Sequence, residues 1–327
     1  MALMGSNLFA VLPFFNGVTK MWNARTRVMS IVFALLAVAL VLPAGCTQRT
    51  PSATVPVEYV AGYIPVAPLI TQPQVEMASP LPQFPPRATV YRINYPAVDA
   101  AHAVEMAKKF AVAGEVREGD DMFTVTDNAT GNVVEVLKTG SINYSLEASA
   151  YSKLLLNDEA QLPSTQEAED IAIRFLEEKN LLPPEVKPFI ETGVDGLSLH
   201  RVRVDFRYKI GEYRGEGPGY RYSVLVGDRG KIAGASVFYP QLETYAEVDL
   251  RSPEEALADV MKGKGSWMQF QGVRAVLDRV SLRYYLQPVL GRQEYVLPVF
   301  VFEGQGMAAD GSASGTVAVI ATAVKSK

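Results

Sequence analysis

Side chains able to do covalent or metal chemistry are few in this chain. Its 327 residues include one cysteine, Cys46, and two histidines, His102 and His200. A single cysteine excludes an intramolecular disulfide, and two histidines so far apart lack the spacing of a zinc site. We therefore expect no metal ion or other cofactor, and Cys46 has to be considered by itself.

Cys46 ends a segment with the layout of an export signal. Two arginines precede residues 28–45, which carry no charge, and Ala44 and Gly45 come directly before the cysteine. A basic region, an apolar run and small residues in this order are typical of secretory signals. Ala44-Gly45-Cys46 resembles the lipobox of bacterial lipoproteins, in which the cysteine thiol is acylated and becomes the first residue of the mature chain.

We expect residues 1–46 to form this signal, with Cys46 as a lipidation site that holds the protein at the extracytoplasmic face of the cell membrane. An uncleaved helix over residues 28–45 is the alternative anchor, because a stretch of this length is near the minimum that spans a bilayer. Met21 is an alternative start, since a signal that begins there has an ordinary short basic region.

Residues 47–87 have the composition of a tether. Nine of the 21 prolines lie in residues 47–86, together with only three charged side chains. Proline at this density disfavours helix and central strand and favours extended chain. We expect a disordered tether, and the alternative is a strand or turn packed on the folded part, supplied by residues 57–60 or 63–64.

The charge of the chain argues against nucleic acid as a partner. The formal net charge is −4, and residues 1–46 contain three basic and no acidic residues, so the remainder carries −7. A surface of this sign gives no electrostatic attraction to phosphate backbones.

Three segments after the tether each begin with a capped helix and continue as strands. We expect Asp99 to cap a helix that ends near residue 113, and Ser164–Glu167 and Ser252–Glu255 to form the capping boxes of two further helices. Apolar runs separated by Gly, Asn and Asp predict strands after each helix. The predicted units are residues 88–160, 161–250 and 251–327.

Each expected helix has one apolar stripe, and such a stripe is buried most simply against a sheet. This predicts an α+β fold of repeated units, each with one helix packed on a small antiparallel sheet, as in the cystatin-like arrangement.

In all three units, the apolar patterns also follow one another in an order that resembles known families. The matching segments are residues 103–110 with Gly114, 168–175 with 181–183, 252–257, 282–285 and 295–302. They resemble PepSY-type domains and the Yyc-type extracytoplasmic regulators of two-component histidine kinases. The resemblance implies a non-enzymatic protein that binds and restrains a protease or a sensor kinase outside the membrane. Yyc-type regulators are usually held by a transmembrane helix, whereas this chain is expected to end its anchor at an acylated cysteine.

No segment has the spacing of a known catalytic centre. Residues 311–315 place alanine where a serine hydrolase needs its nucleophile. The glycines of residues 215–219 and 304–306 lack the strand-to-helix context of a phosphate loop. The acidic cluster at residues 118–121 lacks the spacing of a calcium loop, and we interpret it as a solvated turn.

Aromatic residues are frequent in the second and third units, and tyrosine suits both binding surfaces and strands. We interpret them mainly as core and strand residues. They are Tyr208, Tyr213, Tyr220, Tyr222, Phe238, Tyr239, Tyr245, Trp267, Phe270, Tyr284, Tyr285 and Tyr295.

The sequence therefore predicts a lipid-anchored, non-catalytic binding or regulatory module whose partner is another protein of the cell envelope. Two alternatives stay open. One is an envelope hydrolase that uses a pair of carboxylates from different units, and the other is a lipoprotein that binds a small ligand or a lipid.

Overall fold

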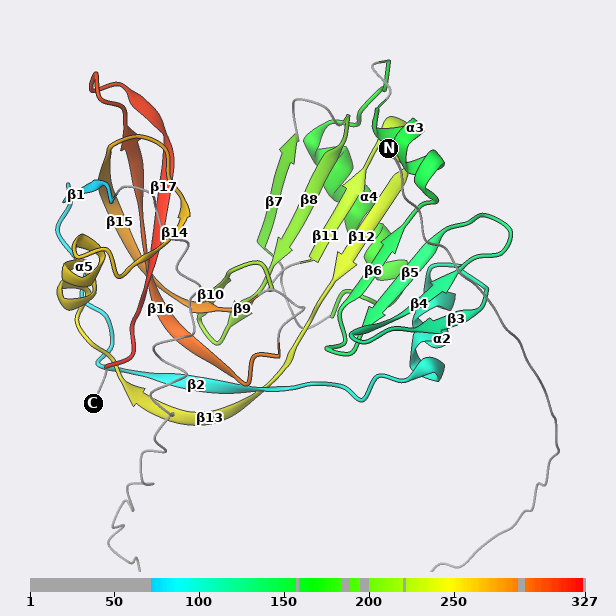
Figure 1. Cartoon of the computed structure of the whole chain (residues 1–327), viewed down its shortest axis with the longest axis horizontal. Coiled ribbons are helices and arrows are strands. Elements are labelled where there is room, and N and C mark those ends of the chain that lie inside the picture. The colour runs from blue at the N-terminus through cyan, green and yellow to red at the C-terminus, as the bar shows by residue number, and fades with distance from the viewer. Residues whose placement is uncertain are drawn as a thin grey trace, which may run out of the picture. The chain divides into compact units, whose positions relative to one another are not determined.

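The computed structural model describes residues 72–156, 159–183, 189–194, 200–219, 222–287 and 292–325. These residues form two large β-sheets and four helices (Figure 1). The predicted signal with Cys46 and most of the predicted tether lie outside the described residues.

The first sheet has eight strands, and all of its neighbouring strands are antiparallel. Strands β6 and β12 pair at its centre, so the sheet joins the first predicted unit to the second. Its strands are, in spatial order, β3 (Val116–Glu118), β4 (Met122–Thr126), β5 (Val133–Leu137), β6 (Ile142–Ser145), β12 (Ile232–Val237), β11 (Tyr222–Val226), β8 (Val202–Arg207) and β7 (Phe189–Val194).

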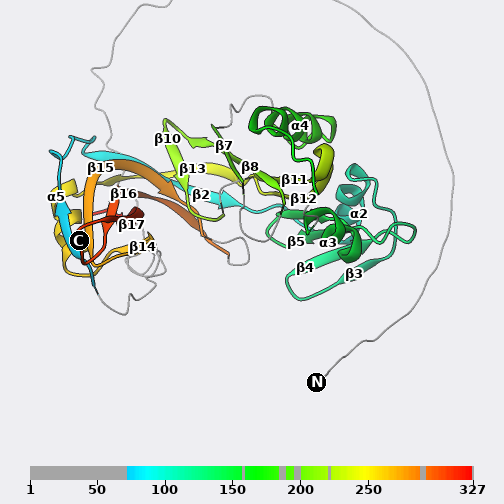
Figure 2. The ribbon, with the colours of Figure 1, turned by 90° about the horizontal axis from the view of Figure 1, so that it is seen from above.

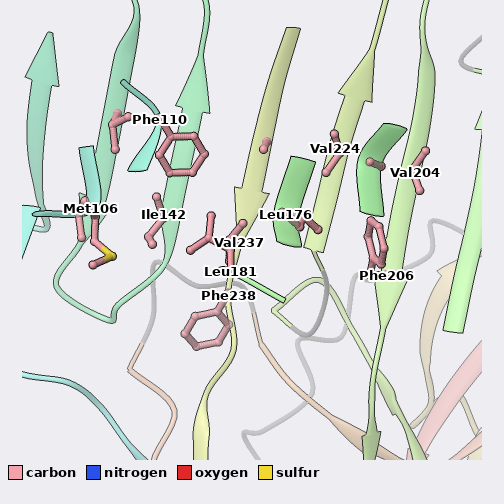
Figure 3. Close-up of a cluster of buried hydrophobic side chains, with 14 of the residues drawn as sticks. Met106, Phe110, Ile142, Leu176, Leu181, Val204, Phe206, Val224, Val237 and Phe238 are labelled. Carbon is pink, nitrogen blue, oxygen red and sulfur yellow. The ribbon is translucent and has the colours of Figure 1, made fainter. Parts of the chain in front are cut away.

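Helices α2 (Ala100–Lys109) and α4 (Thr165–Glu178) pack on one face of this sheet. Figure 2 shows α4 lying across β8 and β11. The core between helices and sheet is apolar. Figure 3 shows Met106 of α2 and the following Phe110 near Ile142, and Leu176 of α4 near Val224 and Val204. Among the described residues, a single short helix packs on the opposite face of this sheet.

That short helix is α3 (Ala148–Leu155), which the sequence did not predict. Leu154 and Leu155 pack against Ala233, with the half-buried Leu225 beside them. Because Val224 and Val226 belong to the core under α2 and α4, strand alternation places Leu225 on the opposite face.

The predicted helix starts are confirmed by their caps. The Asp99 carboxylate accepts a hydrogen bond from the His102 amide at 2.8 Å, and α2 begins at the next residue, Ala100. Ser164 with Glu167 forms the predicted capping box of α4. A second box, Ser252 with Glu255, begins α5 (Pro253–Met261).

The second sheet has nine strands and is mixed. Its longest strands form a hairpin series in which β16 pairs with β15 on one side and with β17 on the other. Strand β2 pairs with β16 on one side and with β13 on the other, while β10 and β1 pair with β15 in parallel. The strands are β1 (Gln74–Met77), β2 (Arg87–Asn94), β9 (Lys209–Ile210), β10 (Tyr213–Glu216), β13 (Gln241–Asp249), β14 (Ser266–Gln269), β15 (Arg274–Tyr285), β16 (Tyr295–Met307) and β17 (Ala313–Thr322).

Helix α5 packs on one face of this sheet through Ala256, Leu257 and Val260. The end of the predicted tether packs against the same core. Strand β1 pairs with the start of β15, and the Phe84 ring lies 5.1 Å from the ring of Phe300. Residues 72–87 therefore pack on the folded part, whereas residues 57–60 and 63–64, where the packed alternative was placed, lie outside the described residues.

The predicted fold class is wrong. The α+β arrangement of repeated units, each with one helix on a small antiparallel sheet, is replaced by a mostly β protein with one large antiparallel and one large mixed sheet. The sheets cross the predicted boundaries because β6 pairs with β12, and because β2 and β10 join the sheet of the last segment. The local patterns predicted most strands but not these long-range pairings.

Candidate functional site

The face of the nine-stranded sheet opposite α5 carries a cluster of charged side chains. On β15, Leu282 joins the core under α5, so strand alternation places the next residue, Arg283, on the opposite face. On β16, Phe302 joins the same core, and Glu303 lies opposite in the same way. Neighbouring strands thus bring the two charged residues to one face.

Arg283 is the centre of the cluster. Its Nη1 donates to Oε2 of Glu216 at 2.5 Å, and its Nη2 donates to Oε2 of Glu303 at 2.6 Å. Its Nε donates to the Ser281 hydroxyl at 2.8 Å. The side chains of Arg283 and Glu216 are only 9% and 5% exposed, so this ion pair is largely removed from water.

Two further arginines extend the ion pairs in both directions. Nη1 of Arg207 donates to Oε1 of Glu216 at 3.3 Å, and the Gly217 amide donates to the same oxygen at 3.2 Å. Nε of Arg279 lies 3.9 Å from Oε2 of Glu303. The result is an alternating series, Arg207–Glu216–Arg283–Glu303–Arg279, with a cation at each end.

Arg283 stays charged in this environment. Burial by itself opposes the charged guanidinium, but the hydrogen bonds to Glu303 and Glu216 outweigh it, and the pKa of Arg283 is raised above its ordinary value. A guanidinium that keeps its proton is a fixed positive charge and a planar donor for oxyanions.

Cationic residues on the neighbouring strands β15, β10 and β9 lie in register with one another. Arg214 of β10 is in register with Arg283, and Lys209 of β9 is in register with Arg214. Residues directly opposite each other on neighbouring strands share a face. Four arginines and one lysine therefore lie around two glutamates, although the whole chain has a net charge of −4.

Two adjoining cavities open at this cluster, and we call them together the arginine groove. They have volumes of about 320 and 500 Å³ and share Arg207, Glu216, Met268, Gln269 and Ala318. The first is also lined by Arg214, Arg279, Arg283, Glu303, Gly304, Thr316 and Val317. The second is also lined by Gly217, Pro218, Ser266, Trp267, Tyr285 and Ile320.

The two ends of the arginine groove differ in character. The first cavity is lined by four arginines and two glutamates, whereas the second shares only Arg207 and Glu216 of these and is otherwise bordered by residues that include Trp267 and Pro218. Met268, which lines both cavities, is 43% exposed. The groove thus combines cationic and apolar surface.

Curvature of the sheet forms the groove. Strands β10 and β14 both line the second cavity, yet β15, β16 and β17 lie between them in the strand order. A sheet that twists and coils can bring such distant strands to one cavity. Among the described strands, β14 pairs only with β17.

Another depression, of about 460 Å³, lies on the eight-stranded sheet beside α3. It is lined by small and apolar residues and by no charged side chain. The Ser236 hydroxyl in it donates to Oδ1 of Asn143 at 2.9 Å. The arginine groove is a stronger candidate than this depression because it is lined by four arginines and two glutamates.

Neither histidine lines the arginine groove. His102 is in the first turn of α2, and the His200 amide donates to the carbonyl of Leu155 at 2.7 Å. Within the described ranges, no three His, Cys, Asp or Glu side chains come together as metal ligands. Cys46, the predicted lipidation site, is outside these ranges.

The acidic segment and the glycine-rich segments differ in whether they border the arginine groove. Glu118, Asp120 and Asp121 are exposed around the turn between β3 and β4, and Glu118 pairs with Lys138 at 3.1 Å. By contrast, Gly217 and Gly304 border the arginine groove. A Cβ atom on Gly304 would lie 2.0 Å from the Val276 carbonyl oxygen, so this glycine lets β16 approach β15.

Many of the aromatic residues singled out in the sequence are core residues. Tyr208, Tyr284, Tyr295 and Trp267 are all less than a tenth exposed, whereas Tyr239 is 40% exposed. Tyr285 is also buried, but it borders the arginine groove.

The sequence did not single out the arginines of the groove. A usable pattern was present, because Arg279 and Arg283 are an even number of residues apart on a predicted strand and so share a face. Arg207 and Glu216 carry no such pattern, since only the pairing of β10 with β15 brings Glu216 to Arg283.

No protein-family model matches the chain, and no curated protein matches its sequence. Among solved structures, it is similar to an uncharacterized protein from Eubacterium rectale ATCC 33656, with 12% identity and a TM-score of 0.46. The match covers 79% of this chain and 91% of that one. Similarity at this level does not establish a shared fold.

The four described helices are all too short or too polar to cross a bilayer. This finding applies to the described part of the chain, which does not include residues 28–45.

Proposed function

We propose that this protein is a non-catalytic binding and regulatory module of the cell envelope. Acylated Cys46 anchors it at the extracytoplasmic face of the membrane, and its partner is another envelope protein, such as a sensor kinase or a protease. The partner binds in the arginine groove.

The observation that carries this proposal is that both glutamates of the groove accept hydrogen bonds from its arginines. Glu216 accepts hydrogen bonds on both oxygens, from Arg283, Arg207 and the Gly217 amide. Glu303 accepts from Arg283. Cations outnumber these carboxylates, so the groove is suited to holding a negatively charged group. Recognition of oxyanions by arginine is a common function of such clusters.

An envelope hydrolase is the second candidate, because two carboxylates from different segments lie in one groove. Glycoside hydrolysis needs one carboxyl group that donates a proton. Both oxygens of Glu216 already accept hydrogen bonds, from Arg207, Arg283 and the Gly217 amide, so protein donors hold this carboxylate. This geometry favours binding over hydrolysis.

Incubation of the full chain with purified cell-wall glycan tests the hydrolase directly. We expect no release of soluble sugar by the wild-type protein. Release that disappears in Glu216→Gln and persists in Arg117→Gln would contradict the proposal. Arg117 is an exposed residue of β3 and serves as the matched control.

The anchor is tested by mass spectrometry of the mature protein. We expect the first residue to be Cys46 carrying a diacylglyceryl group, and Cys46→Ser to abolish lipid labelling. A mature chain that retains residues 28–45 would replace the lipid anchor by the uncleaved helix.

Site-specific crosslinking tests the partner. A photoreactive amino acid in place of Met268 in the full chain should form one main product with an envelope protein in intact membranes. The product should be lost in Arg279→Glu and retained in Arg117→Glu, and the activity of the captured protein should change when the chain is removed. A product that is insensitive to Arg279→Glu would contradict binding in the groove.

A further inference from the structure

We infer that the arginine groove binds an extended acidic segment of the partner protein. Two carboxylates of the segment contact the cations near the two ends of the groove, and an apolar side chain enters the cavity beside Met268. This inference rests on the proposed function and specifies the chemistry of the partner.

The spread of positive charge indicates an elongated ligand. Arg207 and Arg279 lie at opposite ends of the series of ion pairs, and two carboxylates and the Arg283 guanidinium separate them. Arg214 adds positive charge from β10. One phosphate or one carboxylate cannot contact both end cations across these three groups. An extended peptide with two separated acidic residues can do so.

The ion pairs also determine which cations are available to a ligand. Glu216 and Glu303 both bind Arg283, so the charge at the centre of the series is compensated. Arg279 is 70% exposed, and its contacts with Asp278 and Glu303 are 4.0 and 3.9 Å long. Pairs this long and exposed contribute little, so Arg279 can turn to a ligand at small cost.

The second cavity explains why the segment also needs an apolar residue. Its volume of about 500 Å³ is bordered by Met268, Trp267 and Pro218. Methionine is a flexible apolar side chain that adapts to different partners. A side chain of the size of leucine or valine would bury the exposed part of Met268 and remove apolar surface from water.

The strand at the border of the groove suits an extended ligand. Met268 and Gln269 of β14 line both cavities. Among the described strands β14 pairs only with β17, so its other edge can receive the backbone of an added strand. Backbone pairing would orient the acidic side chains along the groove.

Selection from a random heptapeptide library tests the inference. The full chain, purified from membranes in mild detergent, is immobilised and exposed to the library, and selected peptides are then measured by fluorescence polarisation. The variants are Arg279→Glu, which changes an exposed side chain and should fold, and Arg117→Glu as the charge-matched control on β3. Circular dichroism establishes that both variants fold.

We expect enrichment of peptides with two acidic residues three or four positions apart and at least one apolar residue. Arg279→Glu should weaken their binding by about tenfold or more, whereas Arg117→Glu should change it by less than about twofold. Glutamine versions of the selected peptides should bind much more weakly than the glutamate versions.

Other outcomes would overturn the inference. Selection of peptides without acidic residues, or equal binding to wild type and Arg279→Glu, would show that the arginines do not recognise the segment. Complete displacement of a selected peptide by inorganic phosphate or acetate at constant ionic strength would show that the groove takes a single small oxyanion.

The crosslinking experiment at Met268 distinguishes this inference from the proposed function. A crosslinked partner combined with failed peptide selection would leave the proposed function intact and refute the acidic segment. Selected acidic peptides without any crosslinked partner would support recognition of acidic segments by the groove and contradict the proposed envelope partner.

Discussion

Arg283 connects three strands of the nine-stranded sheet. It lies on β15 and binds Glu216 of β10 on one side and Glu303 of β16 on the other. Buried ion pairs gain little net stability because both charges lose water, but removal of one partner is costly. Arg283 is therefore a positioning residue, and the more exposed arginines are the ones expected to contact a ligand.

Replacement of Arg283 tests this role. Arg283→Met should lower the free energy of unfolding by about 3–5 kcal/mol, because it leaves the buried Glu216 carboxylate without its closest partner. Arg279→Met should lower it by less than about 1 kcal/mol, since that side chain is mostly exposed. Urea unfolding followed by circular dichroism measures both. Equal effects of the two variants would contradict the central position of Arg283.

Asp127 is a second residue whose carboxylate stabilises the local structure. It follows β4 and accepts hydrogen bonds from the Ala113 amide at 2.8 Å and from the amides of Ala129 and Thr130 at 3.0 and 2.8 Å. The Thr130 hydroxyl donates to it as well. These bonds, with that of Ala113 the strongest, lower the pKa of Asp127 to about 2.

The lowered pKa gives a pH-dependent contribution to stability. The folded-state pKa of about 2 lies below the value of about 3.9 in an unfolded chain. The contribution is thus fully present above about pH 4 and is lost as the pH falls through 2. We expect Asp127→Asn to be less stable than wild type at pH 7 and the difference to shrink between pH 4 and pH 2. A difference that is constant over this range in thermal unfolding would refute the assignment.

At the scale of secondary structure, the capping boxes start helices α4 and α5. The Ser164 hydroxyl accepts a hydrogen bond from the Glu167 amide at 3.3 Å, and the Ser252 hydroxyl accepts one from the Glu255 amide at 3.2 Å. Ser164→Ala and Ser252→Ala should each cost about 1 kcal/mol in urea unfolding, because an orphan amide loses its acceptor. Ser152→Ala, at an exposed position inside α3, should cost nothing or stabilise slightly. A loss in all three variants would point to a general effect of removing serine.

Helices α4 and α5 were predictable from their capping boxes, whereas α3 has no comparable sequence pattern at its start. The cap of α3 is Glu147, which accepts from the amides of Ser149 and Ala150 at 2.9 and 3.1 Å. Glutamate is not among the preferred N-cap residues, and α3 is only eight residues long. Its start therefore carried no recognisable sequence pattern.

Strand prediction succeeded for the long apolar strands and for the short strands β4, β5 and β6, but it failed for two short strands of the nine-stranded sheet. The sequence predicts strands over residues 272–286, 293–303 and 314–324, close to the observed bounds of β15, β16 and β17. Strands β10 and β14, of four residues each, were not predicted. Both border the arginine groove, so the sequence could predict one wall of the site and not the rest.

At the scale of the whole described structure, long-range pairing determines the fold. The predicted units were wrong because each was given a sheet of its own. Neighbouring strands β6 and β12 are nearly ninety residues apart in the chain, and no local pattern encodes that pairing. The core of the eight-stranded sheet also includes Tyr284, Leu286 and Val296 from the end of the chain. The predicted segments therefore depend on one another for burial.

This shared core predicts that the two sheets unfold together. The chain has two tryptophans, and Trp22→Phe leaves Trp267 on β14 as the only one. In that background, Trp267 fluorescence and far-ultraviolet circular dichroism should give the same urea midpoint, because a single cooperative transition is seen equally by all probes. Asp127→Asn changes only the eight-stranded sheet locally, yet it should lower the midpoint seen by Trp267 as much as the midpoint seen by circular dichroism. Independent units would leave the Trp267 midpoint unchanged in Asp127→Asn, since β14 belongs to the nine-stranded sheet.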